Sequence, residues 1–414
     1  MRHFLAFGNS DQESFRDREV RSCFDYLTVP GTIAAYYQDA TAAFVLSSGL
    51  RYVIDPRTPL FQGEIVAPKA SHYSLAEHHG EAIRQVLGDR KKRTSAAFEP
   101  SMFTPNVITD MTQSVVAFQR TYATRVNALQ QQLSRYARLK AIALGEPQES
   151  SDVTAQPPSF ILLPYFSAAN SQDEWMAINR LVWMTAADNL PEPTKLSAVV
   201  AVQDASVLSV ALSTVPTSLS NTTFFWVAGL DERRSGAYEL RQMARSVLEH
   251  SDARSLINLY GGFFSICLHY LGLWGFSNGL AYSESRDWPD LSSTGAAPAR
   301  YYVRPLHAFL PPATAQALTE YDGFFACPCP VCETRSIVEL SYHELKRHFA
   351  LARKWELEMV HTSDRQTVAQ HLQEVHSRMD RIRREQLPIR LPLVDYLLRW
   401  ASVLTDPTLG TTQA

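Results

Sequence analysis

Cysteine is scarce in this sequence, and long apolar runs are missing. Of the 414 residues only 5 are cysteines, and three of these lie between Cys327 and Cys332. Because the cysteines are few and clustered, we do not expect a scaffold held by disulfides, and a location in the reducing cytoplasm is favoured. No apolar run reaches the roughly 20 residues that a membrane-spanning helix needs, and the N-terminus lacks the apolar core of a signal peptide. We therefore expect a cytoplasmic protein that does not enter a membrane.

A strong net charge is also lacking. The chain has 39 lysines and arginines against 42 aspartates and glutamates, which gives a formal net charge of -3. A nucleic-acid surface on such a mildly acidic body must therefore be a local basic patch. One candidate is the run Arg90–Arg93, which is otherwise a solvated helix end. The other is the group of arginines between Arg378 and Arg384.

The sequence does contain a regular alternation of apolar and amphipathic stretches. Apolar runs of strand length occur at residues 42–48, 51–55, 159–166, 196–202, 222–227, 255–260 and 275–282. Helical periodicity occurs at residues 75–93, 109–143, 173–187, 206–215, 235–251 and 263–271. Such alternating units predict a parallel sheet with crossover helices. Their number, about seven or eight, favours an α/β fold of the (β/α)8 TIM-like barrel type over an open sheet.

Polar residues and glycines follow several of the predicted strands. They are Asp55, Asp231, Gly261-Gly262, Ser277-Asn278 and Glu284-Ser-Arg286-Asp287. In a parallel barrel the carboxyl ends of the strands meet at one mouth, where active sites are built. Simpler roles stay open. Asp55 could cap the turn that follows it, Gly261-Gly262 could form a tight turn instead of admitting a flat ligand or a phosphate, and residues 284–287 could be a salt-bridged loop.

Three cysteines within six residues, Cys327-x-Cys329-x-x-Cys332, form the most specific motif in the chain. Thiolates this close together indicate a metal, because tetrahedral zinc accepts three thiolates and one imidazole. Free surface thiols are the alternative. The histidines within reach in the sequence are His343, His348, His361 and His371. Four protein ligands leave no open position on the metal, so we expect a structural zinc and not a catalytic one.

The chain is therefore expected to divide into two parts. Residues 1–310 are predicted to form the barrel, and residues 311–414 a zinc-binding helical subdomain. The segment from Glu339 to Val403 reads as helical and ends in an amphipathic piece, Leu391–Leu404. That piece would either support a dimer face or pack on its own barrel.

The cysteine motif, followed by a helix and a histidine, resembles the zinc motif that closes the barrel of tRNA-guanine transglycosylases. It also resembles that of their relatives in the DpdA group, which insert 7-deazaguanines into DNA. In this family the fourth zinc ligand lies a little under thirty residues after the last cysteine. The resemblance therefore implies His361, which follows Cys332 by 29 residues.

Three further segments are similar to the family more weakly. Val53–Gln62 resembles the segment Asp-Ser-Gly-Gly-Phe-Gln, whose Asp handles a proton, and Phe225–Leu230 resembles a Gly-Gly-Leu strand that contacts the base. Residues 260–278 resemble the last strand–helix unit. The nucleophilic Asp that the family carries there is replaced by Ser277, so the resemblance leaves Glu284 or Asp287 to take over that role.

The resemblance implies an enzyme that flips a guanine of DNA or tRNA into the barrel mouth and exchanges it for a 7-deazaguanine. Asp55 would be the general acid and base, and Glu284 or Asp287 would stabilise or attack the ribosyl cation. Trp226 is a further candidate for stacking on the base. The residues implied to contact the base or nucleic acid are Gly229, Tyr260, Gly261, Gly262, Ser277, Asn278 and Arg286.

The missing nucleophile also supports a second hypothesis, a catalytically inactive subunit that binds nucleic acid or a protein partner. A homodimer through the zinc region is compatible with either hypothesis. A third possibility, an unrelated zinc hydrolase on a barrel, would need an open metal site.

Overall fold

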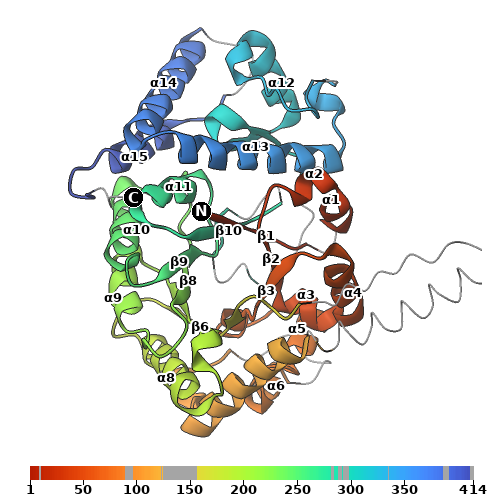
Figure 1. The fold of residues 1–414 in the computed structure, drawn as a ribbon, viewed down its shortest axis with the longest axis vertical. Helices are drawn as coiled ribbons and strands as arrows, with labels where there is room; N and C mark the ends of the chain where they lie inside the picture. Colours follow the sequence, from red (N-terminus) through yellow and green to blue (C-terminus); the bar gives the residue numbers. More distant parts are fainter. Residues whose placement is uncertain are drawn as a thin grey trace, which may run out of the picture.

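The computed structural model describes residues 1–8, 11–88, 97–122, 124, 156–280, 284–287, 291, 298–333, 335–385 and 391–410. Figure 1 shows a sheet with helices on its flanks and a further layer of helices, α12–α14, beside it. Helix α13 forms the side of that layer that faces the sheet.

An eight-stranded parallel sheet organises the first two thirds of the chain. Its strand order is β3-β2-β1-β10-β9-β8-β7-β5. The strands are β1 (Arg2–Ala6), β2 (Tyr26–Pro30), β3 (Arg51–Asp55), β5 (Ser167–Ala168), β7 (Val199–Val202), β8 (Thr222–Val227), β9 (Ser255–Asn258) and β10 (Gly275–Gly279). Nearly all of their residues are buried, as expected for parallel strands covered on both faces.

Residues 159–168 connect the two edges of this sheet. Within them, β4 (Ile161–Leu162) pairs in parallel with β6 (Leu196–Ser197). Just before β4, Phe160 makes a parallel bridge to Val53 of the edge strand β3, and the Ser159 amide donates to the Tyr52 carbonyl at 2.8 Å. The same segment then runs into the opposite edge strand, β5. The sheet is therefore curved into a parallel half-barrel whose edges approach each other.

Aromatic side chains fill the space inside the curved sheet. Phe4 stacks on Tyr26 with the ring centroids 4.5 Å apart, and it meets Phe224 edge-on at 5.8 Å. Phe160 completes the layer, because its ring lies 5.7 Å from Phe224 and 6.2 Å from Trp274. This apolar layer leaves the carboxyl ends of the strands as the place where polar side chains gather.

Helices flank the sheet on both sides. They are α3 (Gly31–Tyr36), α4 (Gln38–Ser48), α5 (Ala70–Ala76), α6 (Glu81–Leu87), a helix over residues 105–122, α8 (Glu174–Asn189), α9 (Leu208–Ser213), α10 (Ala237–His250) and α11 (Phe263–Cys267). Helix α10 buries Leu240, Met243, Ala244 and Val247, which share one helical face. Among the described helices, none has the length and apolar character needed to cross a bilayer.

The C-terminal part begins with a hairpin and continues as helices. Strands β11 (Tyr301–Val303) and β12 (Ala308–Leu310) pair antiparallel, and β11 packs against α13. The helices are α12 (Pro312–Tyr321), α13 (Tyr342–Thr362), α14 (Arg365–Arg384) and α15 (Asp395–Leu404). Helix α15 packs against α10 and α14 of its own chain, which matches one of the two roles expected for residues 391–404. The hairpin contacts the helical part, although the sequence assigned it to the barrel.

Two sequence predictions for the N-terminal region were wrong. Residues 42–48, predicted as a strand, belong to helix α4, which ends at Gly49 with φ of 62°. Strands β1 and β2 were not predicted, so the sheet starts at Arg2 and not near Ala42. A short apolar run does not distinguish a strand from a buried helix segment. The run Arg90–Arg93 and residues 125–143 of the predicted long helix lie outside the described residues.

Candidate metal centre and carboxyl-end site

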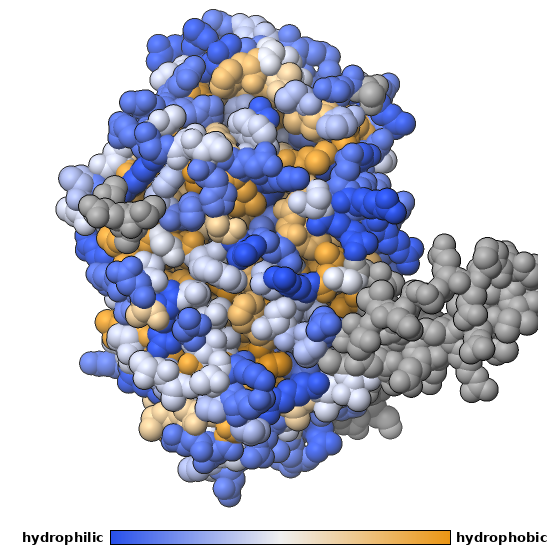
Figure 2. All heavy atoms as spheres, in the orientation of Figure 1, coloured by the Kyte–Doolittle hydropathy of each residue, from blue (hydrophilic) through white to orange (hydrophobic). Residues whose placement is uncertain are grey.

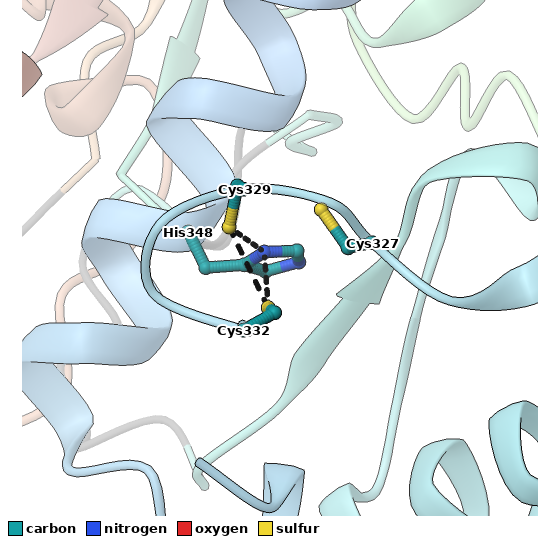
Figure 3. A group of neighbouring side chains, drawn as sticks. All are labelled: Cys327, Cys329, Cys332 and His348. Carbon is teal, nitrogen blue, oxygen red and sulfur yellow. Dashed lines mark hydrogen bonds between the residues drawn. The ribbon is translucent and has the colours of Figure 1, made fainter. Parts of the chain in front are cut away.

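The three clustered cysteines meet a histidine of helix α13. Figure 3 shows Cys327, Cys329 and Cys332 on one loop around the ring of His348. The four ligand atoms all lie within 4.8 Å of one another. The His348 Nδ1 atom is 3.4 Å from the Cys329 sulfur and 3.3 Å from the Cys332 sulfur. Ligand atoms around a tetrahedral zinc are about 3.5–3.8 Å apart, so these residues could bind such an ion.

Neighbouring groups hold the candidate ligands in place. The Cys332 amide donates to the Cys329 carbonyl at 2.9 Å, which closes the tight turn of the loop. The other ring nitrogen of His348, Nε2, lies 2.7 Å from the Tyr302 carbonyl. The Tyr301 ring stacks on His348 with centroids 4.2 Å apart, and its hydroxyl is 3.2 Å from the Cys332 sulfur. Such outer contacts fix the tautomer and orientation of a metal-bound imidazole.

The prediction of His361 as the fourth ligand was wrong, because that residue lies at the far end of α13. It follows His348 by 13 residues, and that spacing corresponds to about 20 Å along a helix. Its ring instead lies 4.6 Å from that of His269. Of the other candidates, His343 contacts the Ser14 hydroxyl at 3.0 Å, and the His371 ring lies 6.5 Å from Phe324.

Asp55 lies at the carboxyl end of β3 and is 2% exposed. Its Oδ1 atom accepts a hydrogen bond from the Tyr165 hydroxyl at 2.7 Å and one from the Arg57 amide at 3.0 Å. Its Oδ2 atom lies 3.6 Å from Nε of the Arg57 guanidinium. Asp55 therefore caps the following turn, as the simpler alternative proposed, and is also part of a buried polar cluster.

Arg57 and Tyr165 strengthen this polar cluster. Arg57 is a non-glycine residue with φ of 52°, a backbone conformation that costs free energy and is often found at functional sites. Burial, together with the nearby negative charge of Asp55, raises the pKa of Tyr165 well above its usual value. The phenol therefore stays protonated and acts as a permanent hydrogen-bond donor to Asp55.

Aromatic and cationic residues from the neighbouring strand ends face this cluster. Tyr260, just after β9, lies 5.2 Å from the ring of Trp226 on β8. The Arg286 guanidinium carbon is 6.0 Å from the centre of the Tyr260 ring. Burial and the charge of Asp55 raise the pKa of Tyr260, whereas the charges of Arg57 and Arg286 lower it. We call the group Asp55, Arg57, Tyr165, Trp226, Tyr260 and Arg286 the carboxyl-end site.

The predicted glycines play different parts around this site. Gly229 has φ of 77°, and a Cβ there would lie 3.8 Å from the carboxyl carbon of Asp287. Gly261 and Gly262 leave no room for a Cβ, because one at Gly261 would lie 2.4 Å from the Ser265 hydroxyl. One at Gly262 would lie 2.9 Å from a Glu232 carboxylate oxygen. The pair therefore makes a tight turn that the protein's own side chains fill.

The two predicted carboxylates of residues 284–287 differ in their surroundings. Glu284 is 9% exposed and pairs with Arg353 and, at 3.3 Å, with Arg233. It therefore points toward helix α13. Asp287 is exposed, and it lies beside Gly229. The main chain between Glu284 and Asp287 packs on the end of β8. Its Arg286 carbonyl accepts hydrogen bonds from the Trp226 indole at 2.9 Å and from the Gly229 amide at 3.2 Å.

Ser277 and Asn278 are both buried in contacts between strands. The Ser277 hydroxyl lies 3.1 Å from that of Thr28, and the Asn278 amide oxygen lies 2.6 Å from Nε2 of His3.

The predicted basic patch lies on helix α14. Arg378 pairs with Asp322, while residues 381, 383 and 384 are exposed arginines. Arg384 also pairs with Asp380 at 2.7 Å, so two of the four arginines of the predicted patch already face carboxylates.

Sequence reasoning missed Glu232, a carboxylate that is 4% exposed. It accepts hydrogen bonds from the amides of Gly262 and Phe264 at 2.9 Å and from the Ser265 hydroxyl at 2.6 Å. Burial raises its pKa to about 7, and the charge of Glu284 adds to this, whereas the hydrogen bonds from Ser265 and Gly262 oppose it. Glu232 therefore holds the Gly261-Gly262 turn and takes up a proton on folding.

This raised pKa predicts a pH dependence of stability. The ordinary pKa of a glutamate is 4.5. The stabilisation that protonated Glu232 gives to the folded state is therefore fully present below pH 4.5 and is lost as the pH rises to about 7. Glu232→Gln cannot ionise, so we expect the unfolding free energy of the wild type, relative to this variant, to fall by about 3 kcal/mol between pH 4.5 and about pH 8. Urea unfolding at several pH values measures the difference. A difference that stays constant with pH would contradict the assignment.

Among the described residues a groove lies at the amino ends of the strands, away from the carboxyl-end site. This groove of about 1440 Å³ is lined by residues at the amino end of β1, the end of α13 and the end of α15, including Arg2, His361 and Asp406. Acidic and basic side chains both line this groove. The groove lies at the amino ends of the strands, whereas ligand sites of parallel α/β sheets lie at the carboxyl ends. Figure 2 shows mainly hydrophilic residues on the face it draws, with apolar residues scattered among them.

The signals for the missed residues were of unequal strength. Tyr165 is the next-to-last residue of the apolar run of residues 159–166, so its position near a strand end was visible, but its partner was not. Arg353 and Glu356 lie on the buried face of α13 together with Phe349, Ala352 and Val360, and the three-residue spacing of the two charges suits an ion pair. In a scan against models of known protein families the chain gives no match, and a search of curated proteins finds no significant relative.

Proposed function

We propose that the eight strands close into a (β/α)8 barrel, with the carboxyl-end site at its mouth. The bridge between Val53 and Phe160 and the pairing of β4 with β6 support closure, because they lie between the two edge strands. The metal at Cys327, Cys329, Cys332 and His348 would be a structural zinc. A parallel barrel followed by a closed Cys3His site is the arrangement that the resemblance to tRNA-guanine transglycosylases implies, although the resemblance gives His361 as the fourth ligand and the cluster contains His348.

The protein, in this proposal, acts on the N-glycosidic bond of a guanine in DNA or tRNA and exchanges the base for a 7-deazaguanine. The observation that carries the proposal is the buried Asp55 at a strand end, held by Tyr165 and flanked by Arg57. A carboxylate with fixed donors, next to aromatic rings, suits general acid–base work on a flat heterocycle. Tyr260, which is 9% exposed, would stack on the base with the buried Trp226 ring behind it, and Arg286 would offer a positive charge to a phosphate.

The proposed exchange needs a nucleophile as well, and Asp287 fits that role better than Glu284. Glu284 is buried and paired with two arginines, whereas Asp287 is exposed. An Asp287 oxygen would bond to ribose C1′ while the bond from C1′ to guanine breaks, and the leaving base would take its electron pair and a proton from Asp55. The incoming base would then return a proton to Asp55, bond to C1′ and release Asp287.

A base-exchange assay tests this function. Purified protein of verified zinc content is mixed with labelled guanine or a labelled 7-deazaguanine, and with tRNA or duplex DNA in separate reactions. Incorporation of label into one nucleic acid would support the proposal and identify the substrate. An absence of incorporation into both would contradict it.

The same assay separates the two carboxylates. We expect Asp287→Asn to reduce the rate of incorporation by at least about 100-fold, because the nucleophile is lost, with an unchanged melting temperature. Glu284→Gln should mainly lower the melting temperature, since it leaves Arg353 without one of its two carboxylates. The opposite pattern would assign the nucleophile to Glu284.

The second candidate function is a non-catalytic subunit of the same fold. It is favoured by Ser277, which stands where the resemblance expects the nucleophile and is buried against Thr28. In that case the protein would bind nucleic acid or a partner subunit, or would pair with a second copy of itself, without exchanging a base. Tight nucleic-acid binding, unaffected by Asp55→Asn and accompanied by no incorporation, would select this candidate.

A further inference from the structure

A buried arginine connects helix α13, which carries the candidate ligand His348, with the segment 284–287 beside the carboxyl-end site. Arg353, in the middle of α13, is 0% exposed. One nitrogen donates to Glu356 at 2.8 Å, and another pairs with Glu284 of the segment 284–287. A fully buried guanidinium destabilises a protein unless carboxylates pair with it. The arginine and its two carboxylates, Glu284 and Glu356, therefore form one unit.

The same unit reaches the candidate metal centre. The Glu356 Oε1 atom accepts a hydrogen bond from the Tyr302 hydroxyl at 2.8 Å and lies 2.6 Å from Nδ1 of His307. The Tyr302 carbonyl, in turn, lies 2.7 Å from Nε2 of His348, the candidate ligand. Contacts therefore run without a gap from His348 through Tyr302, Glu356 and Arg353 to Glu284.

At its other end the unit meets the carboxyl-end site. Two residues after Glu284, the Arg286 carbonyl binds the Trp226 indole and the Gly229 amide. The side chain of Arg286 lies against the Tyr260 ring. The segment is therefore anchored at two points, by Glu284 on Arg353 of α13 and by the Arg286 carbonyl on the end of β8.

We infer that Arg353 is a positioning residue, through which the metal-binding helix holds segment 284–287 over the carboxyl-end site. This role does not depend on which reaction, if any, the site performs. It assigns Glu284 to a structural role and makes metal binding and the order of the site interdependent, because His348 and Arg353 stand on the same helix.

Hydrogen–deuterium exchange tests the inference without any assay of activity. We expect Arg353→Met, in zinc-loaded full-length protein, to speed exchange about tenfold or more in peptides that contain residues 226–230 and 284–287. Peptides of β2 and β3 should exchange as in the wild type, and the zinc content should stay unchanged. Removing zinc from the wild type with a chelator should speed exchange in the same two regions.

Arg347→Met is the matched control. Arg347 is on the same helix, but its guanidinium is 31% exposed and pairs with Asp17 and Glu19. This control should leave exchange in residues 226–230 and 284–287 unchanged.

If Arg353→Met does not fold, Glu284→Gln provides the second variant, because it keeps the size of the side chain and should show the same local pattern. Wild-type exchange in both regions of a folded variant would overturn the inference. A uniform increase over the whole chain would also overturn it, since it would reduce Arg353 to a general contributor to stability.

Discussion

Replacing His348 by alanine should release the metal, whereas replacing His361 should not. We expect the purified protein to contain about one zinc per chain, His361→Ala to keep it, and His348→Ala to lose most of it. Metal binding to such sites contributes apparent free energies of about 10–16 kcal/mol in small zinc domains. The loss should therefore unfold the loop of residues 326–333 and destabilise the C-terminal helices. Metal analysis and thermal unfolding of the two variants measure the effect.

This pair of variants is decisive because both histidines stand on α13. His348 faces the three sulfur atoms from within 3.3–3.4 Å of two of them, whereas His361 contacts His269 near the other end of the helix. A His361→Ala protein without zinc, or a His348→Ala protein with a full complement, would contradict the geometry.

Asp55→Asn should have the largest effect on base exchange. The substitution keeps the shape of the side chain and an oxygen that can accept from Tyr165 and from the Arg57 amide, but it removes the group that takes and gives the proton. Loss of a general acid–base group costs about 10²–10⁴-fold in rate. We expect a reduction in that range in single-turnover experiments, together with a lower melting temperature, because the substitution also takes the negative charge away from the largely buried Arg57.

Asp204→Asn provides the control for this substitution. Asp204 caps a short helix by accepting from the Ser206 amide at 2.8 Å, and an asparagine can do the same. The control should exchange bases at the wild-type rate. A wild-type rate in Asp55→Asn would exclude Asp55 as the acid and base.

The strands with the clearest sequence patterns are those that the structure confirms. Residues 222–227 form a continuous run of β-branched and aromatic residues and are strand β8, and residues 51–55 are β3. Strand β1 was missed because Arg2–Ala6 contains the polar His3, whose ring is satisfied by Asn278 from the distant strand β10. Such a pairing, between residues 275 positions apart, leaves no local signal in the sequence.

The candidate sites show the same limit. The cysteines were predictable because three ligands share one turn, but the fourth ligand depends on how α13 packs against that turn. The spacing taken from a resembling family therefore indicated His361 where the fold supplies His348. Asp55 was visible at a strand end, whereas its partner Tyr165 lies 110 positions away. Glu284 could be separated from Asp287 only once Arg353 was seen in three dimensions.

The most direct test of the central claim is a crystal structure of the zinc-loaded protein with a 7-deazaguanine bound. The account predicts the base at the carboxyl ends of the strands, within hydrogen-bond reach of Asp55 and in contact with the rings of Trp226 or Tyr260. A base bound elsewhere, for example in the groove beside Arg2 and His361, would contradict it.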